Sequence, residues 1–365
     1  RGRAVSEDRL GPSQGVRSLP GGDGTEPLGI STTSTMSFVA GCVQLPGRAG
    51  CDPEIAVQGV TMARRYGIYD VFTDQVLAGN PLAIIFDGDD LDDETMQAVA
   101  REMNLSETVF VQRATNAAHA ASLRIFTPAR ELPFAGHPTV GTAVALAELQ
   151  RGHEGDIDMV CVLEEKVGPV RCAVRLREHA ASFAEFDLPR APTKVDLPLD
   201  MQGLADALSL QVGAIGFENH RASIWSAGVP FIMIPVHGRT EVDSLEFDPG
   251  LWEKVAPFAD GGLAAAYVYS RGGTHHHAKF HARMFSPDMG ITEDPATGSA
   301  VAALAGAVHH FDALPDGHHP LLVEQGVQMG RPSYIHLHID VKEGRIARAR
   351  IGGEAVRLAR GTLEL

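Results

Sequence analysis

Two glycine-led segments of the sequence could bind an anion. Gly136 and Gly298 each begin an Ala-rich apolar run that predicts a buried helix, and Ser299 follows the second glycine. The first turn of a helix has unpartnered backbone N–H groups and a partial positive charge, and glycine lets a ligand approach that backbone closely. Each segment is therefore a candidate cradle for a carboxylate or phosphate. Ordinary helix capping explains either segment alone, whereas a pair of them favours a shared role.

Three titratable side chains could transfer protons. His137 follows the first glycine, Asp294 lies just upstream of the second, and Glu107 lies at a predicted helix–strand junction. Burial at such a junction raises the pKa of a carboxyl group, which suits a general acid or base, and a neutral histidine can relay a proton. The residue pattern alone also fits structural roles: packing or capping for His137, a helix N-terminal charge for Asp294, and a surface or capping position for Glu107.

Other chemistries lack the residues that they need. The sequence has no GxGxxG after its first predicted strand and no GxxxxGK[ST], so no nucleotide cofactor is predicted. Residues 62–365 contain no GxSxG nucleophile elbow, and neither glycine-led helix start carries a cysteine. The run His275–His277, with His281, has metal-ligand residue types, but neighbouring strand residues point to opposite faces. We therefore predict no metal and no organic cofactor.

Hydrophobic patterning places these residues on short strands alternating with a few helices. An amphipathic helix is predicted over residues 92–103, and mostly apolar, buried helices over residues 137–149 and about 298–310. Strands are predicted over residues 68–72, 82–86, 108–111, 122–126, 159–163, 170–176, 231–234, 264–269, 321–324, 334–339 and 346–351, with another around Ile224.

The chain repeats this pattern once. Residues 124–128 (RIFTP) match residues 283–287 (RMFSP), and each segment leads through a loop to one of the glycine-led helices. Two copies imply two related domains with the site in the cleft between them. We predict an α+β fold with an N-terminal domain over residues 62–181 and a C-terminal domain over residues 182–365. The last strand or helix of the chain is expected to pack back on the first domain.

Length, charge and cysteine content restrict the class of protein. The 365 residues are 44% hydrophobic, enough for two cores, and 31 basic against 46 acidic residues give a net charge of −15. Such an acidic chain is a poor binder of nucleic acid. No apolar stretch of about 18 residues predicts a membrane span. Four cysteines without a CxxC pair favour the reducing cytoplasm over a disulfide framework.

Residues 1–61 differ from the rest of the chain. They are rich in Gly, Ser, Thr and Pro and lack any sustained period of 2 or 3.6. We interpret them as a disordered extension, or as translated sequence upstream of a start at Met62. A transit peptide is the alternative, although its acidic residues argue against it.

Several motifs together resemble the phenazine-biosynthesis (PhzF-like) family, over about residues 66–365. In chain order they are YDVFT (69–73), GNPLA (79–83), LSETVF (105–110), GHPTVGTA (136–143), DPATGSA (294–300) and EQGVQMGRPS (324–333). The resemblance implies the diaminopimelate-epimerase fold, in which two pseudo-symmetric domains each wrap a curved sheet around a central helix. It also implies a homodimer.

The resemblance also assigns roles to the candidate residues. The best-known member of the family isomerises trans-2,3-dihydro-3-hydroxyanthranilate without a metal or organic cofactor. By this resemblance Glu107 takes a proton from one ring carbon and returns a proton elsewhere, and His137 and Asp294 are further polar residues of the site. Ser299 matches another polar residue and, with Gly136 and Gly298, supplies backbone donors to the carboxylate of a small substrate.

The sequence departs from the related epimerases at one pair of positions. Those enzymes use two cysteines, and the aligned positions are Ala135 and Thr297, neither of which can act as a thiolate base. Two alternatives to the isomerase remain. One is a cofactor-independent epimerase or racemase of an amino-acid-like substrate that uses Glu107 with His137 or Asp294. The other is a non-catalytic small-molecule-binding homologue.

Overall fold

The computed structural model describes residues 63–365 except 152–154 and 260. The predicted disordered extension over residues 1–61 lies outside the described residues. Within the described part of the chain, no helix combines the length and the apolar character needed to cross a membrane.

The first half of the described chain contains eight strands and two helices. The strands are β1 (Ala63–Val71), β2 (Asn80–Ile85), β3 (Glu107–Gln112), β4 (Ala121–Phe126), β5 (Glu131–Leu132), β6 (Ile157–Glu165), β7 (Gly168–Leu176) and β8 (Ser182–Asp187). The helices are α1 (Asp93–Met103) and α2 (Gly136–Arg151). The sheet strands surround α2, which contacts β1, β2, β3, β6, β7 and β8, while α1 packs on β3 and β4.

The second half has the same plan with longer additions. Its strands are β9 (Thr193–Val195), β10 (Ser223–Ser226), β11 (Pro230–Pro235), β12 (Phe258–Ala259), β13 (Gly262–Leu263), β14 (Ala265–Arg271), β15 (Phe280–Ser286), β16 (Ile291–Asp294), β17 (Gly317–Gln325) and β18 (Ser333–Lys342). Its helices are α3 (Met201–Ala207), α4 (Arg239–Ser244), α5 (Pro249–Val255) and α6 (Gly298–Asp312). The central helix α6 contacts β9, β10, β11 and β18.

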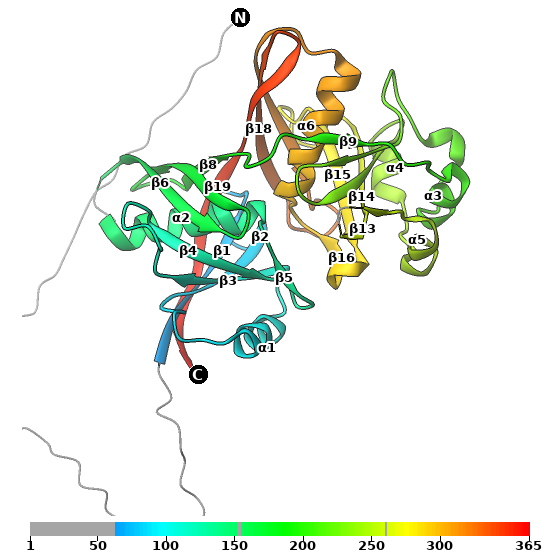
Figure 1. Cartoon of the computed structure of the whole chain (residues 1–365). Helices are drawn as coiled ribbons and strands as arrows, with labels where there is room; N and C mark the ends of the chain where they lie inside the picture. Colours follow the sequence, from blue (N-terminus) through cyan, green and yellow to red (C-terminus); the bar gives the residue numbers. More distant parts are fainter. Residues whose placement is uncertain (1–62, 152–154, 260) are drawn as a thin grey trace, which may run out of the picture. The chain divides into compact units, whose positions relative to one another are not determined.

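The last strand, β19 (Arg345–Glu364), joins the two halves. It pairs antiparallel with β18, then with β8, and finally with β1. All nine residues of β1 have a partner in β19. Figure 1 shows β19 running from the side of β18 to the side of β1. Because of this strand, one hydrogen-bonded sheet of 17 strands continues through both halves.

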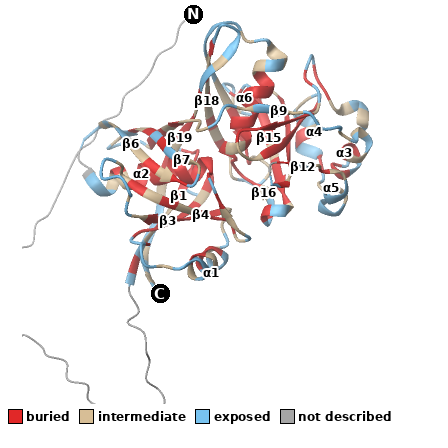
Figure 2. Cartoon of the chain, viewed as in Figure 1, coloured by how far each residue is buried: buried red, intermediate tan, exposed pale blue. Residues whose placement is uncertain are grey.

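Both central helices are buried, as their apolar sequences predict. Residues 300–308 of α6 are all buried, and in α2 burial extends from residue 136 to residue 145. Figure 2 shows the two helices largely in the buried colour, inside the strands. The predicted α+β fold of two pseudo-symmetric parts, each a curved sheet around a central helix, is therefore confirmed. The predicted domain boundary at residues 181/182 stays a prediction.

The strand ladders follow the internal repeat. The parallel pair β2–β3 has its counterpart in β11–β14, the antiparallel pair β3–β4 in β14–β15, and the parallel pair β4–β6 in β15–β17. Side-chain contacts repeat as well. Glu164 of β6 accepts hydrogen bonds from N and Oγ1 of Thr115, and Glu324 of β17 accepts them from N and Oγ1 of Thr274. The loop that carries His275 is therefore the counterpart of the β3–β4 loop.

The longer helices and several strands were predicted nearly to their bounds, whereas the short helices were missed and the longest strands were predicted too short. The amphipathic pattern correctly predicted α1, whose Asp92 caps the N-terminus by accepting from N of Thr95. The short helices α3, α4 and α5 were not predicted, because six or seven residues carry too little periodicity. The strand predicted over residues 346–351 is in fact 20 residues long, because it finds pairing partners in three different strands.

Candidate active site

Glu107 enters the interior at the junction between α1 and β3. Asn104 ends α1 in the left-handed conformation, with φ of 49°, and the chain then turns into β3. Glu107 is the first residue of β3 and pairs with Leu82 of β2. Its side chain is only 10% exposed, and its Oε2 lies 3.3 Å from Nδ1 of His137 in the first turn of α2. Two predicted site residues of the first half are therefore neighbours.

Asp294 brings a second carboxyl group from the other half. It is the last residue of β16, and its Oδ1 accepts hydrogen bonds from Nδ2 of Asn80 and from Oγ of Ser106, both at 2.8 Å. Its Oδ2 accepts from Oγ1 of Thr297 at 2.5 Å. Nδ2 of Asn80 also lies 3.3 Å from Nδ1 of His137. Asn80 therefore connects Asp294 with His137 across the two halves.

Burial shifts the protonation equilibria of this cluster. Burial raises the pKa of Glu107 well above its ordinary value, and the negative charge of nearby Asp294 acts in the same direction. Burial also raises the pKa of Asp294 to about 6, although three hydrogen bonds from neighbouring side chains favour the ionised form. The pKa of His137 is lowered by burial to about 3, so this imidazole is neutral near pH 7. Its contact with Glu107 is therefore not an ion pair.

The two central helices meet at their N-termini. A Cβ atom added to Gly136 would lie 2.7 Å from Cα of Gly298, and one added to Gly298 would lie 2.9 Å from Cα of Gly136. Only glycine permits this approach of the two backbones. Thr297 precedes α6 but makes no capping bond to its first turn, since its hydroxyl donates to Asp294. Ser299, half-buried, is the second residue of α6. The N–H groups at this end of α6 therefore have no side-chain cap, as expected for a helix end that binds an anion.

Several buried polar atoms of the cluster also lack a partner. Among the described residues, no hydrogen bond reaches Oε2 of Glu107, Nε2 of His137 or Oδ1 of Asn80. Buried polar atoms are nearly always hydrogen-bonded in native proteins. An acid/base pair, unpartnered polar atoms and two adjoining helix N-termini together form a site that can bind a small anion and move a proton on it.

The structure brings together the six residues that the sequence singled out and adds others. Sequence analysis missed the roles of Asn80, Ser106 and Gln325, whose Nε2 donates to the backbone oxygen of Asp294 at 2.7 Å. All three lie inside motifs that carry the family resemblance, which is the signal that could have identified them.

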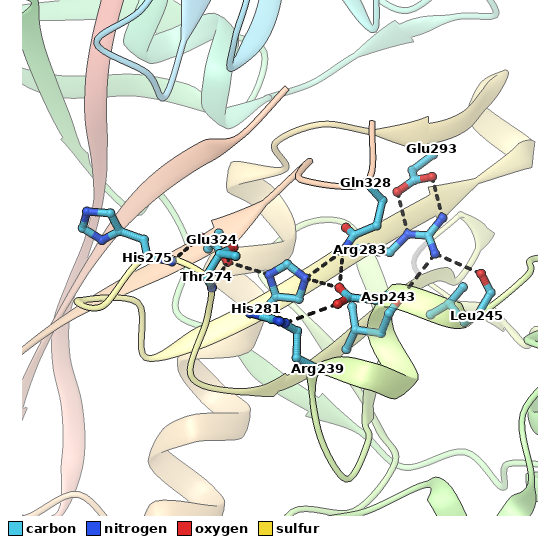
Figure 3. A network of polar contacts seen from close by, with 11 residues as sticks. Arg239, Asp243, Leu245, Thr274, His275, His281, Arg283, Glu293, Glu324 and Gln328 are labelled. Carbon is cyan, nitrogen blue, oxygen red and sulfur yellow. Dashed lines mark hydrogen bonds and ion pairs between the residues drawn. The ribbon is translucent and has the colours of Figure 1, made fainter. Parts of the chain in front are cut away.

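The histidine run has its own set of polar contacts. His281 is fully buried, with Nδ1 2.7 Å from Oε2 of Glu324 and Nε2 3.2 Å from Oδ1 of Asp243 (Figure 3). The backbone N–H of His275 donates to the same glutamate. In residues 63–365, outside the gaps, no group of three or more His, Cys, Asp or Glu side chains could hold a metal ion.

Comparisons with known proteins identify relatives along the described chain. The sequence model of the family "phenazine biosynthesis-like protein" matches residues 69–361. An uncharacterized isomerase of Mesorhizobium japonicum is 52% identical over 301 residues, which are 82% of this chain and 98% of that protein. The trans-2,3-dihydro-3-hydroxyanthranilate isomerase of Pseudomonas fluorescens is 34% identical over 82% of this chain and 99% of its own length. The crystal structure of a Bacillus anthracis phenazine biosynthesis protein superposes with a TM-score of 0.73, at 24% identity, over 83% of this chain and 100% of that one.

Proposed function

Because the chain belongs to the phenazine biosynthesis-like family, we propose that it is an isomerase that moves a proton within a small carboxylate-bearing substrate, with Glu107 as the acid/base group. The observation that carries this proposal is the buried contact between Glu107 and His137, beside Asp294 and the two adjoining helix N-termini. The named relative of Pseudomonas fluorescens makes trans-2,3-dihydro-3-hydroxyanthranilate the first substrate to test. The homodimer and the cytoplasmic location stay predictions.

The proposed reaction begins with binding of the substrate carboxylate at Gly136 and Gly298. Their N–H groups and helix dipoles stabilise the negative charge that develops when a proton leaves a substrate carbon. Glu107 in its ionised form takes this proton, the double bond shifts, and the carboxylic acid returns a proton to another carbon. The carboxyl group ends in its starting state, so one base suffices.

The internal repeat supports a single base. Glu107 begins the parallel ladder between β2 and β3, and the residue that begins the equivalent ladder between β11 and β14 is Ala265. The second half thus has no carboxylate at the position of Glu107. The positions of the epimerase cysteines carry Ala135 and Thr297, and Thr297 is engaged with Asp294. This asymmetry favours a proton that leaves and returns through one residue.

An epimerase is the second candidate because Asp294 has a pKa of about 6 and comes from the half opposite Glu107. Two carboxyl groups on opposite sides of a substrate carbon could remove a proton from one face and deliver one to the other. Proton NMR in heavy water separates the two reactions. An isomerase shifts a double bond, whereas an epimerase exchanges a single α-hydrogen and inverts that centre.

The test of the proposed function compares wild type with Glu107→Gln, using trans-2,3-dihydro-3-hydroxyanthranilate in heavy water. We expect the variant to lose at least ~10³-fold in kcat, because the amide cannot accept the proton, while substrate binding is retained. Wild-type kcat/KM should rise with pH as Glu107 ionises, with a midpoint above 4.5. Glu102→Gln, which changes an exposed glutamate of α1, is the matched control and should be unaffected. A Glu107→Gln enzyme with a near-normal rate would exclude Glu107 as the base.

A further inference from the structure

Glu165 is a buried carboxyl group that the proposed reaction does not use. It ends β6 and is only 7% exposed. Its Oε1 lies 2.7 Å from Oγ1 of Thr139, and its Oε2 is buried without a hydrogen-bond partner among the described residues. No cation in that part of the chain lies within ion-pair distance of it, and Lys166, the next residue, contacts Glu131 instead. An ionised carboxylate in this position would have no compensating charge.

Counting hydrogens indicates which group donates to which. Oγ1 of Thr139 lies 2.7 Å from the backbone oxygen of Ala135 and 2.7 Å from Oε1 of Glu165. A hydroxyl has one hydrogen, and a carbonyl oxygen can only accept. If both contacts are hydrogen bonds, Thr139 donates to Ala135 and must accept from Glu165. Glu165 then carries the proton and is a neutral acid.

The internal repeat independently favours a neutral group here. Glu164 and Glu324 are equivalent residues of β6 and β17, so the residue that corresponds to Glu165 is Gln325. Gln325 is a neutral amide, and its Nε2 donates to Oγ1 of Thr297 at 3.0 Å, directly before α6. Each half thus places one side chain of nearly the same shape against a threonine near the start of its central helix, although the two threonines occupy different positions of the repeat: Thr139 lies inside α2 and Thr297 just before α6. A protonated glutamate offers an O–H donor where the glutamine offers an N–H donor.

We propose that Glu165 is a neutral hydrogen-bond donor that, through Thr139, positions the Ala135–Gly136 peptide at the start of α2 for binding of the substrate carboxylate. The inference rests on the proposed function, in which Gly136 forms part of the carboxylate cradle. Glu165 is a positioning residue, since within the described part of the chain its hydrogen bond leads to the cradle through Thr139.

Ionisation of Glu165 reverses this arrangement. The hydroxyl hydrogen of Thr139 then turns to the carboxylate, and the backbone oxygen of Ala135 is left with its longer hydrogen bond, 3.3 Å, from N of Thr139. A buried negative charge then lies near the end of α2 that binds the substrate anion. Burial raises the pKa of Glu165 to about 8, against a partial opposing effect of the Thr139 hydrogen bond. The buried thiol of Cys172 on β7 also interacts electrostatically with this carboxyl, and the pKa of the thiol is raised above its ordinary value, chiefly by Cys161. Carboxylate binding should therefore weaken above about pH 8.

The first arm of the test is thermal melting of wild type and Glu165→Gln between pH 5 and pH 9. The folded-state pKa of Glu165 lies above its ordinary value, so its contribution to stability is present at low pH and is lost as pH rises from 4.5 to about 8. We expect nearly equal melting temperatures at pH 5 and a variant that melts several degrees higher at pH 9. If the melting temperatures of the two proteins have the same pH dependence, or if the variant melts lower by the same amount at every pH, Glu165 is not a neutral donor.

The second arm measures KM and kcat for trans-2,3-dihydro-3-hydroxyanthranilate over the same pH range. Wild-type KM should rise above pH 8 by up to ~10-fold per pH unit, with a smaller change in kcat, and Glu165→Gln should abolish the rise. Thr139→Val, which removes the relay, should raise KM at every pH. If the melting curves diverge but wild-type KM is independent of pH, the positioning role is wrong. If they diverge and neither protein converts the substrate, the neutral donor stands and the proposed function fails.

Discussion

Replacing Gly136 with alanine should push apart the two helix N-termini that form the proposed cradle. The added Cβ would lie 2.7 Å from Cα and 3.1 Å from C of Gly298. Both atoms belong to backbone, so no side-chain rotation can relieve the contact. An ordinary carbon contact begins near 3.4 Å, so the starts of α2 and α6 must separate by roughly 0.7 Å.

The expected cost is larger for catalysis than for folding. Overpacking of this kind destabilises a protein by about 1–3 kcal/mol, and alanine returns up to about 1 kcal/mol through its higher helix propensity. A substrate displaced by about 1 Å from a catalytic group can lose ~10²-fold in rate, equivalent to about 2.7 kcal/mol of transition-state stabilisation. We expect Gly136→Ala to lower kcat/KM by about this factor while the protein stays folded.

Gly141→Ala is the matched control on the same helix. Its Cβ would meet Cδ2 of Leu82 and Cγ2 of Val71, both also at 2.7 Å. Those atoms are side-chain methyl groups, which can rotate away, and not the backbone of the cradle, so the control should lose stability without a comparable loss of activity. The assay pairs steady-state kinetics with urea unfolding for both variants. The cradle would be refuted by a Gly136→Ala enzyme with wild-type KM and kcat, or by equal losses of activity in both variants.

Two further predictions concern stability. The pKa of His137 in the folded state is lowered to about 3. Its contribution to the free energy of unfolding is therefore present above pH 6.5 and is lost as pH falls, at up to about 1.4 kcal/mol per pH unit. Urea unfolding between pH 7 and pH 4 should therefore show a shallower acid loss for His137→Gln, and identical slopes would contradict the assignment. Arg331 donates to Oδ1 of the fully buried Asp70 at 2.5 Å and to the backbone oxygens of residues 78 and 79. Arg331→Met should cost about 3–5 kcal/mol, and adding Asp70→Asn should recover part of it; no recovery would mean that the buried charge is not the cause.

The sequence was informative where a feature is local and periodic. The amphipathic run of α1 and the apolar runs of α2 and α6 predicted their types and nearly their bounds, because side-chain spacing along a helix is recorded in consecutive residues. The matching segments RIFTP and RMFSP predicted two related parts, because a repeat can be recognised from a few consecutive residues. Strand lengths were less predictable, since a strand such as β19 ends where its partners end.

The candidate site shows the same division. Composition and motifs excluded nucleotide loops and supplied the resemblance that assigned Glu107, but nothing local distinguished this glutamate from other acidic residues. Its burial and its contact with His137 exist only after β3 and α2 pack together. The link through Asn80 joins residues 214 positions apart, and no periodicity records such a distance.

By itself, the sequence determined the family, the α+β class, the repeated plan and the residue types available for chemistry, because these follow from short patterns along the chain. Only the tertiary structure decided which of these residues are neighbours and how they are protonated. Burial raises the pKa of Asp294 and of Glu165, and the approach of Gly136 to Gly298 joins the two helix ends. These properties depend on desolvation and on contacts between distant segments, which exist only once the chain has folded.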